Sequence, residues 1–264
     1  MTELYRGLWV VAYRDILGFV SDRFRIFASL TFPLLFLVIF GAGFSNVIGQ
    51  MGGGIDIVQF MYPGIIAQVV LTTSLFAGVS IVSDREVGFL REILVAPLSR
   101  TGIVLGKAAG AAAVALLQIL VLLLVAPLVR VPLEVTTVLL LVPTMAVLSL
   151  ALSSLGVLIG SYAPSQQGFQ LFMQMLIFPM IFLAGVYFPV DSVPLWMEIL
   201  TKVNPVTYGV DAIRQVFLGA APAGAGLGVT VFGHTMTFVQ EVAVVGALGV
   251  VLMAAAIWAF RRQA

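Results

Sequence analysis

Charged residues are scarce in this sequence: Asp, Glu, Lys and Arg together make up 9% of the 264 residues and leave a formal net charge of +1. A soluble domain carries roughly a quarter charged residues. Because 61% of the residues are hydrophobic, the chain would expose far too much apolar surface if it folded in water. We therefore expect an integral membrane protein. The near-neutral charge also argues against a nucleic-acid partner, since no basic patch is present to neutralise phosphates.

The residues on which most enzymes and metal sites depend are scarce as well. Cysteine is absent, which excludes disulfides and thiolate metal sites but names no compartment. His234 is the only histidine and falls in a predicted outer loop, so neither a zinc motif nor a histidine-based catalytic pair within the membrane can form. We expect no catalytic, cofactor-binding or metal-binding residue, and no enzymatic activity of the chain by itself.

A phosphate-binding loop is missing too. Residues 102–108 end in Gly106-Lys107-Ala108 and resemble such a loop only superficially, because the spacing is wrong and Ala108 stands where a metal-binding Ser or Thr belongs. We interpret this segment as the start of a membrane span, with Lys107 reaching out to the cytoplasmic interface. We expect the chain to bind no ATP by this route.

Long apolar runs are what the sequence has in abundance. Six of them reach the roughly 20 residues needed to cross a bilayer core. These runs cover residues 26–46, 60–82, 103–129, 135–160, 169–190 and 238–260. Strands of a membrane barrel would instead show segments of about ten residues with alternating hydrophobicity. The sequence therefore predicts an all-α integral membrane protein with six transmembrane helices in a single domain, residues 1–264.

The basic residues orient these spans. If the N-terminus is inside and the number of spans is even, only Arg130, Lys202 and Arg214 fall outside. The other Lys and Arg residues fall on the cytoplasmic side, where they are normally in excess; they are Arg6, Arg14, Arg23, Arg25, Arg85, Arg91, Arg100, Lys107, Arg261 and Arg262. We expect both termini in the cytoplasm.

Residues 1–25 precede the first span and are amphipathic. Their apolar residues recur at helical spacing, and the charged residues fall mainly on the opposite face; the apolar set is Leu8, Trp9, Ala12, Ile16, Phe19 and Val20. This pattern is typical of an interface helix whose apolar face is turned toward the membrane. Such a helix either anchors the chain only or also contacts a cytoplasmic partner.

Residues 83–102 form a polar segment between two apolar runs. Six of its twenty residues are charged, although a simple connection could be far shorter. Val87, Leu90 and Leu94 share one helical face, Pro97 ends the helix, and Ser99 or Thr101 can cap the next one. The pattern predicts a short amphipathic helix that offers a contact surface to another protein. The alternative is a solvated loop with an incidental mixture of charges.

A second amphipathic segment, residues 191–219, is too polar to span the membrane. Two short helices that meet at Asn204-Pro205 would fit it, entering the outer leaflet as re-entrant structure. Irregular backbone at membrane depth is tolerated only where protein or a water-filled cavity satisfies it. The segment therefore either belongs to a transport pathway or forms a structural lid; its candidate residues are Trp196, Asn204, Pro205, Tyr208, Asp211 and Arg214.

The predicted spans carry neutral polar residues and no charge near their centres, and Glu241 comes closest, near an outer end. Ion-coupled carriers usually keep at least one buried charge as a relay, so an autonomous carrier is disfavoured. The neutral groups either join helices by hydrogen bonds or line a weakly polar path between the second and fifth spans. The candidate path residues are Gln68, Thr72, Gln170, Gln174 and Phe178.

Two stretches resemble the ABC-2 type exporter permeases, a family that includes the membrane subunits of daunorubicin-resistance, nodulation-factor and O-antigen exporters. The first runs from Arg85-Glu86-x-Gly88 through Leu94-Val95-Ala96-Pro97-Leu98-Ser99-Arg100 to Gly106-Lys107. The second comprises residues 182–189 and the motif Asn204-Pro205-Val206-Thr207-Tyr208-Gly209-Val210-Asp211-Ala212-Ile213-Arg214. One departure is Gly88-Phe89-Leu90-Arg91, where many relatives carry Gly-Thr-Leu-Glu.

The resemblance implies a type V exporter-like fold in the bacterial inner membrane. It implies a homodimer, or a pair with a close paralogue, served by two copies of a separate ATP-binding subunit that carries ATP and Mg. Residues 83–97 would be the coupling helix seated in a groove of that subunit, with the N-terminal helix beside it. The implied coupling residues are Asp84, Arg85, Glu86, Phe89, Leu90, Arg91, Glu92 and Pro97.

The expected function is that of a permease subunit of an ATP-driven exporter. A path lined by Gln, Thr and Phe without charge favours a hydrophobic or amphipathic substrate, drug-like or lipid-like, taken from the cytoplasm or the inner leaflet. Export of a lipid-linked oligo- or polysaccharide is an alternative within the same class. A carrier or channel that needs no ATPase is the alternative of another class.

Overall fold

A computed structural model describes residues 2–49, 57–88, 99–129, 131, 133–186, 194–218, 230–231 and 234–262. Nearly all of these residues are helical. In chain order the helices are α1 (Thr2–Ser21), α2 (Arg23–Gly49), α3 (Ile57–Leu75), the 3₁₀ turn η1 (Phe76–Gly78), α4 (Val79–Glu86), α6 (Arg100–Val125), η2 (Ala126–Val129), α7 (Val135–Tyr162), α8 (Gln166–Leu183), α9 (Leu195–Val203), α10 (Pro205–Leu218) and α11 (Phe238–Arg262). The predicted all-α fold is confirmed apart from one short antiparallel pair, β1 (Thr230–Val231) with β2 (His234–Thr235).

Four helical segments of the described chain are long and apolar enough to cross a membrane. They are Met61–Glu86, Arg100–Val125, Val135–Tyr162 and Phe238–Arg262. The first of them runs through η1 and α4, so the polar segment 83–102 begins as a helical extension of a span. Helices α2 and α8 correspond to the first and fifth predicted spans, and the count of six spans stays a prediction.

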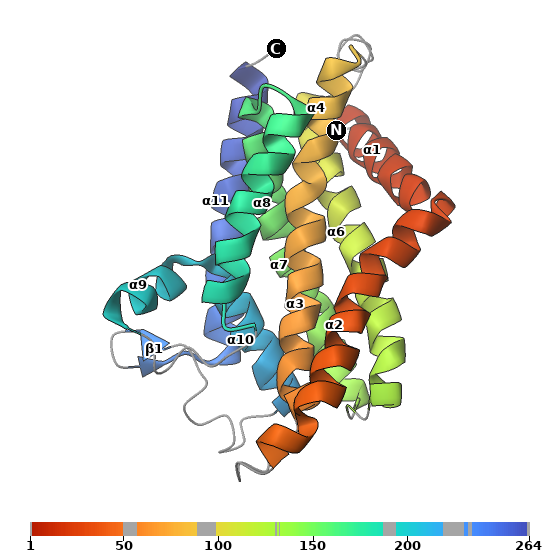
Figure 1. Ribbon diagram of the computed structural model, residues 1–264. Helices are drawn as coiled ribbons and strands as arrows, with labels where there is room; N and C mark the ends of the chain where they lie inside the picture. Colours follow the sequence, from red (N-terminus) through yellow and green to blue (C-terminus); the bar gives the residue numbers. More distant parts are fainter. Residues whose placement is uncertain are drawn as a thin grey trace.

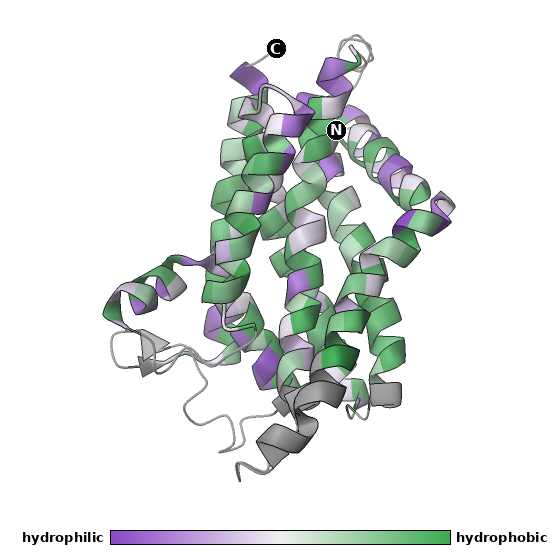
Figure 2. Ribbon diagram, in the orientation of Figure 1, coloured by the Kyte–Doolittle hydropathy of each residue, from purple (hydrophilic) through white to green (hydrophobic). Residues whose placement is uncertain are grey.

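The long helices form a bundle with two distinct ends (Figure 1). Both termini and the end of α4 lie at one end, whereas α9, α10 and the β1–β2 pair lie at the other. Helix α1 crosses the bundle at an angle near the terminal end. Apolar residues run along the helices and polar residues gather toward the ends, as Figure 2 shows. This is the distribution expected when a bilayer surrounds the middle of a bundle.

Helix α3 lies at the centre of the core and packs against α2, α6, α7 and α10. Its side chains are apolar on all sides rather than along one stripe, which is typical of a helix enclosed by neighbours. The residues Ile65, Ile66, Val70, Leu71 and Leu75 are almost completely buried. Polar side chains within the core pair across helices: Thr73 Oγ1 lies 2.5 Å from Gln118 Oε1, and Ser74 Oγ lies 2.7 Å from Ser149 Oγ. For these residues the helix-bonding interpretation is confirmed.

Glycines allow α7 to approach the end of α3 backbone to backbone. A Cβ atom at Gly156 would collide with the carbonyl oxygen of Leu75, and one at Gly78 would collide with the carbonyl oxygen of Gly156. A rigid main chain cannot move aside as the tip of a side chain can. The same contact holds η1, and so the start of α4, against α7.

We therefore expect Gly156→Ala to destabilise the fold by about 1–3 kcal/mol, the range for overpacking a tight interior. Thermal unfolding in detergent, followed by intrinsic fluorescence, measures the effect. Gly246→Ala is the matched control, because a Cβ there meets only Val147 Cγ1 at an ordinary 3.6 Å. An unchanged melting temperature for Gly156→Ala would show that the close approach is not required.

Candidate coupling site

The last three residues of α4, Asp84-Arg85-Glu86, each contact a different part of the bundle. We call them the coupling junction. Helix α4 ends at Glu86, and the backbone then turns at Gly88, whose φ is 81°. A positive φ is readily adopted by glycine and costs other residues energy. The junction therefore lies where the membrane span gives way to the rest of the polar segment.

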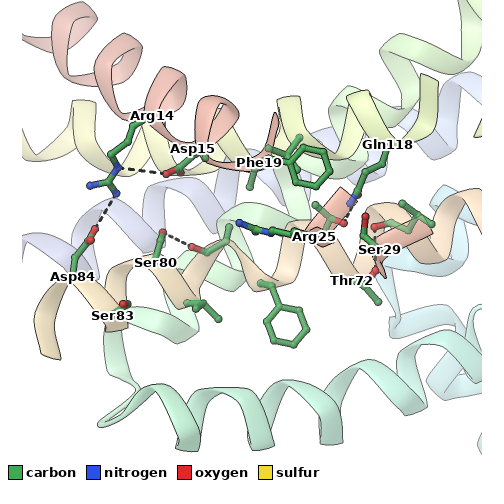
Figure 3. Close-up of a pocket in the computed structure, with 18 residues that line it drawn as sticks. Arg14, Asp15, Phe19, Arg25, Ser29, Thr72, Ser80, Ser83, Asp84 and Gln118 are labelled. Atoms are coloured by element: carbon green, nitrogen blue, oxygen red, sulfur yellow. Dashed lines mark hydrogen bonds and ion pairs between the residues drawn. The ribbon is translucent and has the colours of Figure 1, made fainter. Parts of the chain in front are cut away.

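Asp84 joins three helices through one carboxylate oxygen. Its Oδ2 accepts a hydrogen bond from Lys107 Nζ of α6 at 2.7 Å and one from Arg14 Nη2 of α1 at 3.3 Å (Figure 3 shows the Arg14 contact). Only 1% of Lys107 is exposed. The prediction that Lys107 reaches out to the cytoplasmic interface is therefore wrong. A buried ammonium needs a partner, and the carboxylate of Asp84 supplies one inside the protein.

Asp15 of α1 completes the charge cluster. Its carboxylate lies 3.7 Å from Arg14 Nε and close enough to Lys107 to feel that charge. Burial raises the pKa of the Asp15 carboxyl above its usual value, and the charges of Lys107 and Arg14 oppose that rise. Two cations and two carboxyls thus face one another where α1, α4 and α6 meet.

Arg85 and Glu86 hold the ends of two other helices. The guanidinium of Arg85 donates to the carbonyl oxygen of Ser161 at 3.2 Å and to that of Ala163, at the C-terminus of α7. Glu86 Oε1 accepts from the backbone N–H of Gln166 at 2.9 Å, at the N-terminus of α8. A cation at a helix C-terminus and an anion at an N-terminus complement the helix dipoles and satisfy backbone groups that lack intrahelical partners.

Helix α1 packs closely on α6 at three glycines whose common spacing was not noted in the sequence. Gly102, Gly106 and Gly110 recur every four residues, so they share one face of α6. A Cβ at Gly102 would lie 2.7 Å from Leu4 O, and one at Gly106 would lie 2.8 Å from Leu8 O. Small residues at this spacing let two helices approach closely. The spacing alone was a signal that could have found this contact.

The apolar face predicted for residues 1–25 is divided in the structure. Ala12 and Phe19 are buried against the bundle, whereas Trp9 is 68% exposed and Val20 is 52% exposed. The exposed apolar side of α1 also carries Tyr5, Val10, Tyr13 and Leu17. Part of the predicted apolar face therefore packs against protein. That the exposed part is turned toward the membrane stays a prediction.

The remaining coupling residues, Phe89, Leu90, Arg91, Glu92 and Pro97, lie outside the described residues, so the helix expected there stays a prediction. On the far side of that segment Ser99 caps α6, since its Oγ accepts from the backbone N–H of Gly102 at 3.1 Å. The expected cap is confirmed.

The candidate path residues fall into two groups. Gln68 is buried and Thr72 is partly buried on α3, and the Thr72 hydroxyl donates to the carbonyl oxygen of Gln68 at 2.9 Å. Gln170, Gln174 and Phe178 lie one turn apart along the exposed side of α8. The path between the two helices stays a prediction.

At the other end of the bundle, Asn204 and Pro205 separate α9 from α10 as the sequence suggested. Asn204 Nδ2 donates to the carbonyl oxygen of Met180 at 2.8 Å, and its Oδ1 accepts from the N–H of Val206 at 3.1 Å. Pro205 occupies the first position of α10, where its missing N–H costs nothing. The break is therefore built into the sequence and tied to α8.

The other candidate residues at this end differ in their surroundings. Trp196 is largely exposed on α9, and the Tyr208 hydroxyl donates to the carbonyl oxygen of Lys202 at 2.7 Å. Asp211 and Arg214 are buried, and Arg214 Nη2 donates to the carbonyl oxygen of Gly185 at 2.7 Å. Gln215 bridges Asp211 and the fully buried Glu241 with contacts of 3.3 and 3.1 Å. The charged groups of Asp211, Arg214 and Glu241 are thus enclosed by the protein.

Comparison with known proteins agrees with this architecture. Residues 6–218 match the family model described as "ABC-2 type transporter", from α1 to the end of α10. The chain belongs to the ABC-2 type transporter family.

Several curated proteins are similar to this permease. It is 30% identical to "Nodulation protein J" of Rhizobium meliloti (strain 1021), over 82% of this chain and 79% of that protein. It is 25% identical to "Putative transport permease ycf38" of Cyanophora paradoxa, over 80% of this chain and 73% of that protein. It is 32% identical to "Probable multidrug ABC transporter permease YbhR" of Escherichia coli (strain K12), over 62% of this chain and 45% of that protein. The protein is accordingly a membrane transport permease, from a family of permeases rather than of catalytic enzymes.

The ion pair between Asp84 and Lys107 predicts a distinctive double-mutant cycle in the permease. Removing one partner of a buried pair leaves an uncompensated charge and costs about 3–5 kcal/mol. We expect Asp84→Asn and Lys107→Met each to lower stability by about that amount, and the double variant to lose clearly less than the sum. Thermal unfolding of the four proteins in one detergent measures the coupling.

Lys202→Met provides a control for this cycle. Lys202 Nζ lies 2.6 Å from Glu198 Oε1, but both side chains are at least one-third exposed, so we expect a cost of about 1 kcal/mol or less. Strictly additive losses for Asp84→Asn and Lys107→Met would mean that the two residues do not depend on each other.

Proposed function

We propose that this chain is the permease subunit of an ATP-driven exporter and that the driving motion enters through residues 83–102. The observation that carries the proposal is the coupling junction. Asp84, Arg85 and Glu86 follow one another in the chain and contact α1 and α6, the end of α7, and the start of α8 respectively. Any displacement of the segment that follows them would pass directly to these helices.

Two copies of a separate ABC ATP-binding subunit would supply that displacement, with ATP and Mg bound on those subunits. The name of the Escherichia coli relative, an ABC transporter permease, supports a partner of this kind. Residues 89–97 would sit in a groove of the ATP-binding subunit, and α1 would lie beside them. A partner can shift the bundle between states only if its contacts differ between those states. Asp84, Arg85 and Glu86 would then transmit the motion, with Phe89, Leu90, Arg91, Glu92 and Pro97 nearer the partner.

The topology that suits this function has six spans, with α2 as the first and α8 as the fifth. Both termini and the end of α4 lie at the same end of the bundle, which would be the cytoplasmic side of a bacterial inner membrane (Figure 1). Helices α9 and α10 would then be the outer re-entrant pair. The buried charges of α10, Asp211 and Arg214, would suit a site enclosed by protein at the outer leaflet.

A second permease subunit, either another copy or a close paralogue, would cover α8. The exposed side of this helix combines polar Gln170 and Gln174 with a large apolar area formed by Leu171, Phe172, Met175 and Phe178. An apolar area of this kind, interrupted by amides, suits a path for a hydrophobic or amphipathic substrate that is drug-like or lipid-like. A lipid-linked oligo- or polysaccharide would use the same features and is the second candidate.

Charge reversals at Arg91 and at Glu86 distinguish binding of the ATP-binding subunit from transmission of its motion to the bundle. We expect Arg91→Glu to weaken co-purification of the ATP-binding subunit. Glu86→Arg should leave the complex assembled but lower the transport per ATP hydrolysed by roughly tenfold, since it removes a charged hydrogen bond to α8. The measurement is transport together with ATPase activity in proteoliposomes.

Glu134→Arg is the matched control, because Glu134 is an exposed residue before α7 whose carboxylate accepts a hydrogen bond from the nearby Thr136. We expect it to retain both assembly and coupling. Full transport by the purified chain without any nucleotide-binding partner would reject the exporter and favour an autonomous carrier or channel.

A further inference from the structure

A cavity of about 600 Å³ lies beside the bend between α1 and α2, and residues of α1, α2, α3, η1, α4 and α6 line it (Figure 3). No residue of α8 lines it within the described part of the chain. Its volume falls within the range of small-molecule sites, about 300–1,000 Å³. The cavity is therefore large enough for a ligand and separate from the α8 surface.

Four charged residues line this cavity: two cations, Arg14 and Arg25, and two carboxyls, Asp15 and Asp84. Arg14 and the buried Lys107, which is not part of the wall, both donate to Asp84. Asp22, at the bend itself, accepts the backbone N–H of Arg25 at 2.9 Å and does not line the cavity. An anionic ligand would therefore meet Arg25 rather than Arg14, which already pairs with Asp84.

Arg25 is the cation best placed to receive that anion. Its side chain extends between α1 and the α3–α4 helix in Figure 3. Its guanidinium lies 5.7 Å from the centre of the Phe19 ring, and among the described residues no carboxylate forms an ion pair with it. Ser83, also on the wall, offers a hydroxyl. A guanidinium and a hydroxyl are both donors suited to phosphate-type oxygens.

Another part of the cavity wall is apolar, which suits the part of an amphiphile next to its headgroup better than a free ion. Phe19, Val69, Phe76 and Val114 supply an apolar surface next to the charged end. The exposed aromatic side of α1, with Trp9 and Tyr13, is typical of a helix at the level of lipid headgroups. Arginine at this level can meet anionic headgroups of the leaflet.

We propose that this cavity binds the phosphate-type anionic headgroup of an amphiphile from the adjacent leaflet, with Arg25 as the principal cation. The ligand is either an anionic phospholipid of the membrane or a transported amphiphile with the same headgroup chemistry. Because Arg14 and Asp84 belong both to this wall and to the charge cluster, occupancy is linked to the coupling junction. That linkage rests on the proposed function, whereas the binding itself does not.

The test uses the full chain without ATP-binding subunits, in nanodiscs of phosphatidylcholine with and without phosphatidylglycerol. We expect phosphatidylglycerol to bind saturably, as counted by native mass spectrometry, and to raise the melting temperature. Arg25→Gln should weaken the apparent affinity about tenfold. Arg23→Gln is the matched control, since Arg23 begins the same helix but lies outside the cavity wall, and it should bind as the unchanged chain does.

Val114→Phe fills the cavity without changing any charge and should abolish binding. The melting temperature of this variant in phosphatidylcholine alone checks that it still folds. Absence of saturable binding, or equal losses for Arg25→Gln and Arg23→Gln, would overturn the proposal. Phosphatidylglycerol bound without any change in the ATPase rate of the assembled complex identifies membrane lipid as the source. Stimulation of that rate identifies a transported amphiphile. If binding fails while the complex still exports, only the cavity proposal is lost.

Discussion

The end of the bundle that holds both termini depends on the ion pair between the buried Lys107 and Asp84. An unpaired charge in such a place costs several kcal/mol, so the carboxylate of Asp84 must stay within hydrogen-bonding distance. That requirement fixes the position of α4 along the axis of α6. Once Asp84 is fixed, Arg14 of α1 has a defined partner, and the next two residues can reach only the ends of α7 and α8. One ion pair thereby sets the positions of several helices.

A junction of this kind is stiff by construction. Its contacts are made by consecutive residues on one helical turn, and the side chains that reach α7 and α8 end on backbone atoms rather than on flexible side chains. Displacement at one end therefore cannot be absorbed locally without breaking a charged hydrogen bond. In a transporter, such stiffness lets a small movement outside the membrane become a movement of whole helices. The backbone contact of Gly78 with Gly156 has the same effect about two turns further along the span.

The sequence was sufficient for features that depend on local pattern. Apolar length predicted the long helices, Ser99 marked a cap, and Asn204-Pro205 marked the break between α9 and α10. Features that depend on residues distant in the chain could not be predicted from the sequence. The burial of Lys107 depends on Asp84 across a polar segment, and the two faces of α1 depend on α6. The three glycines of α6 are intermediate, because their spacing was visible but their partner was not.

That glycine seam also has a consequence for biogenesis. Residues 4–12 of α1 are made before α6, yet the face they pack against is Gly102 to Gly110 of that helix. During synthesis α1 must wait while the intervening spans are inserted, and it has no neighbour to cover its inner face. Its second apolar side, with Trp9 and Tyr13, can hold it at the membrane surface during that interval. The two apolar sides of α1 then act one after the other. The exposed side holds the helix at the bilayer first, and the inner side packs onto α6 once that helix has been inserted.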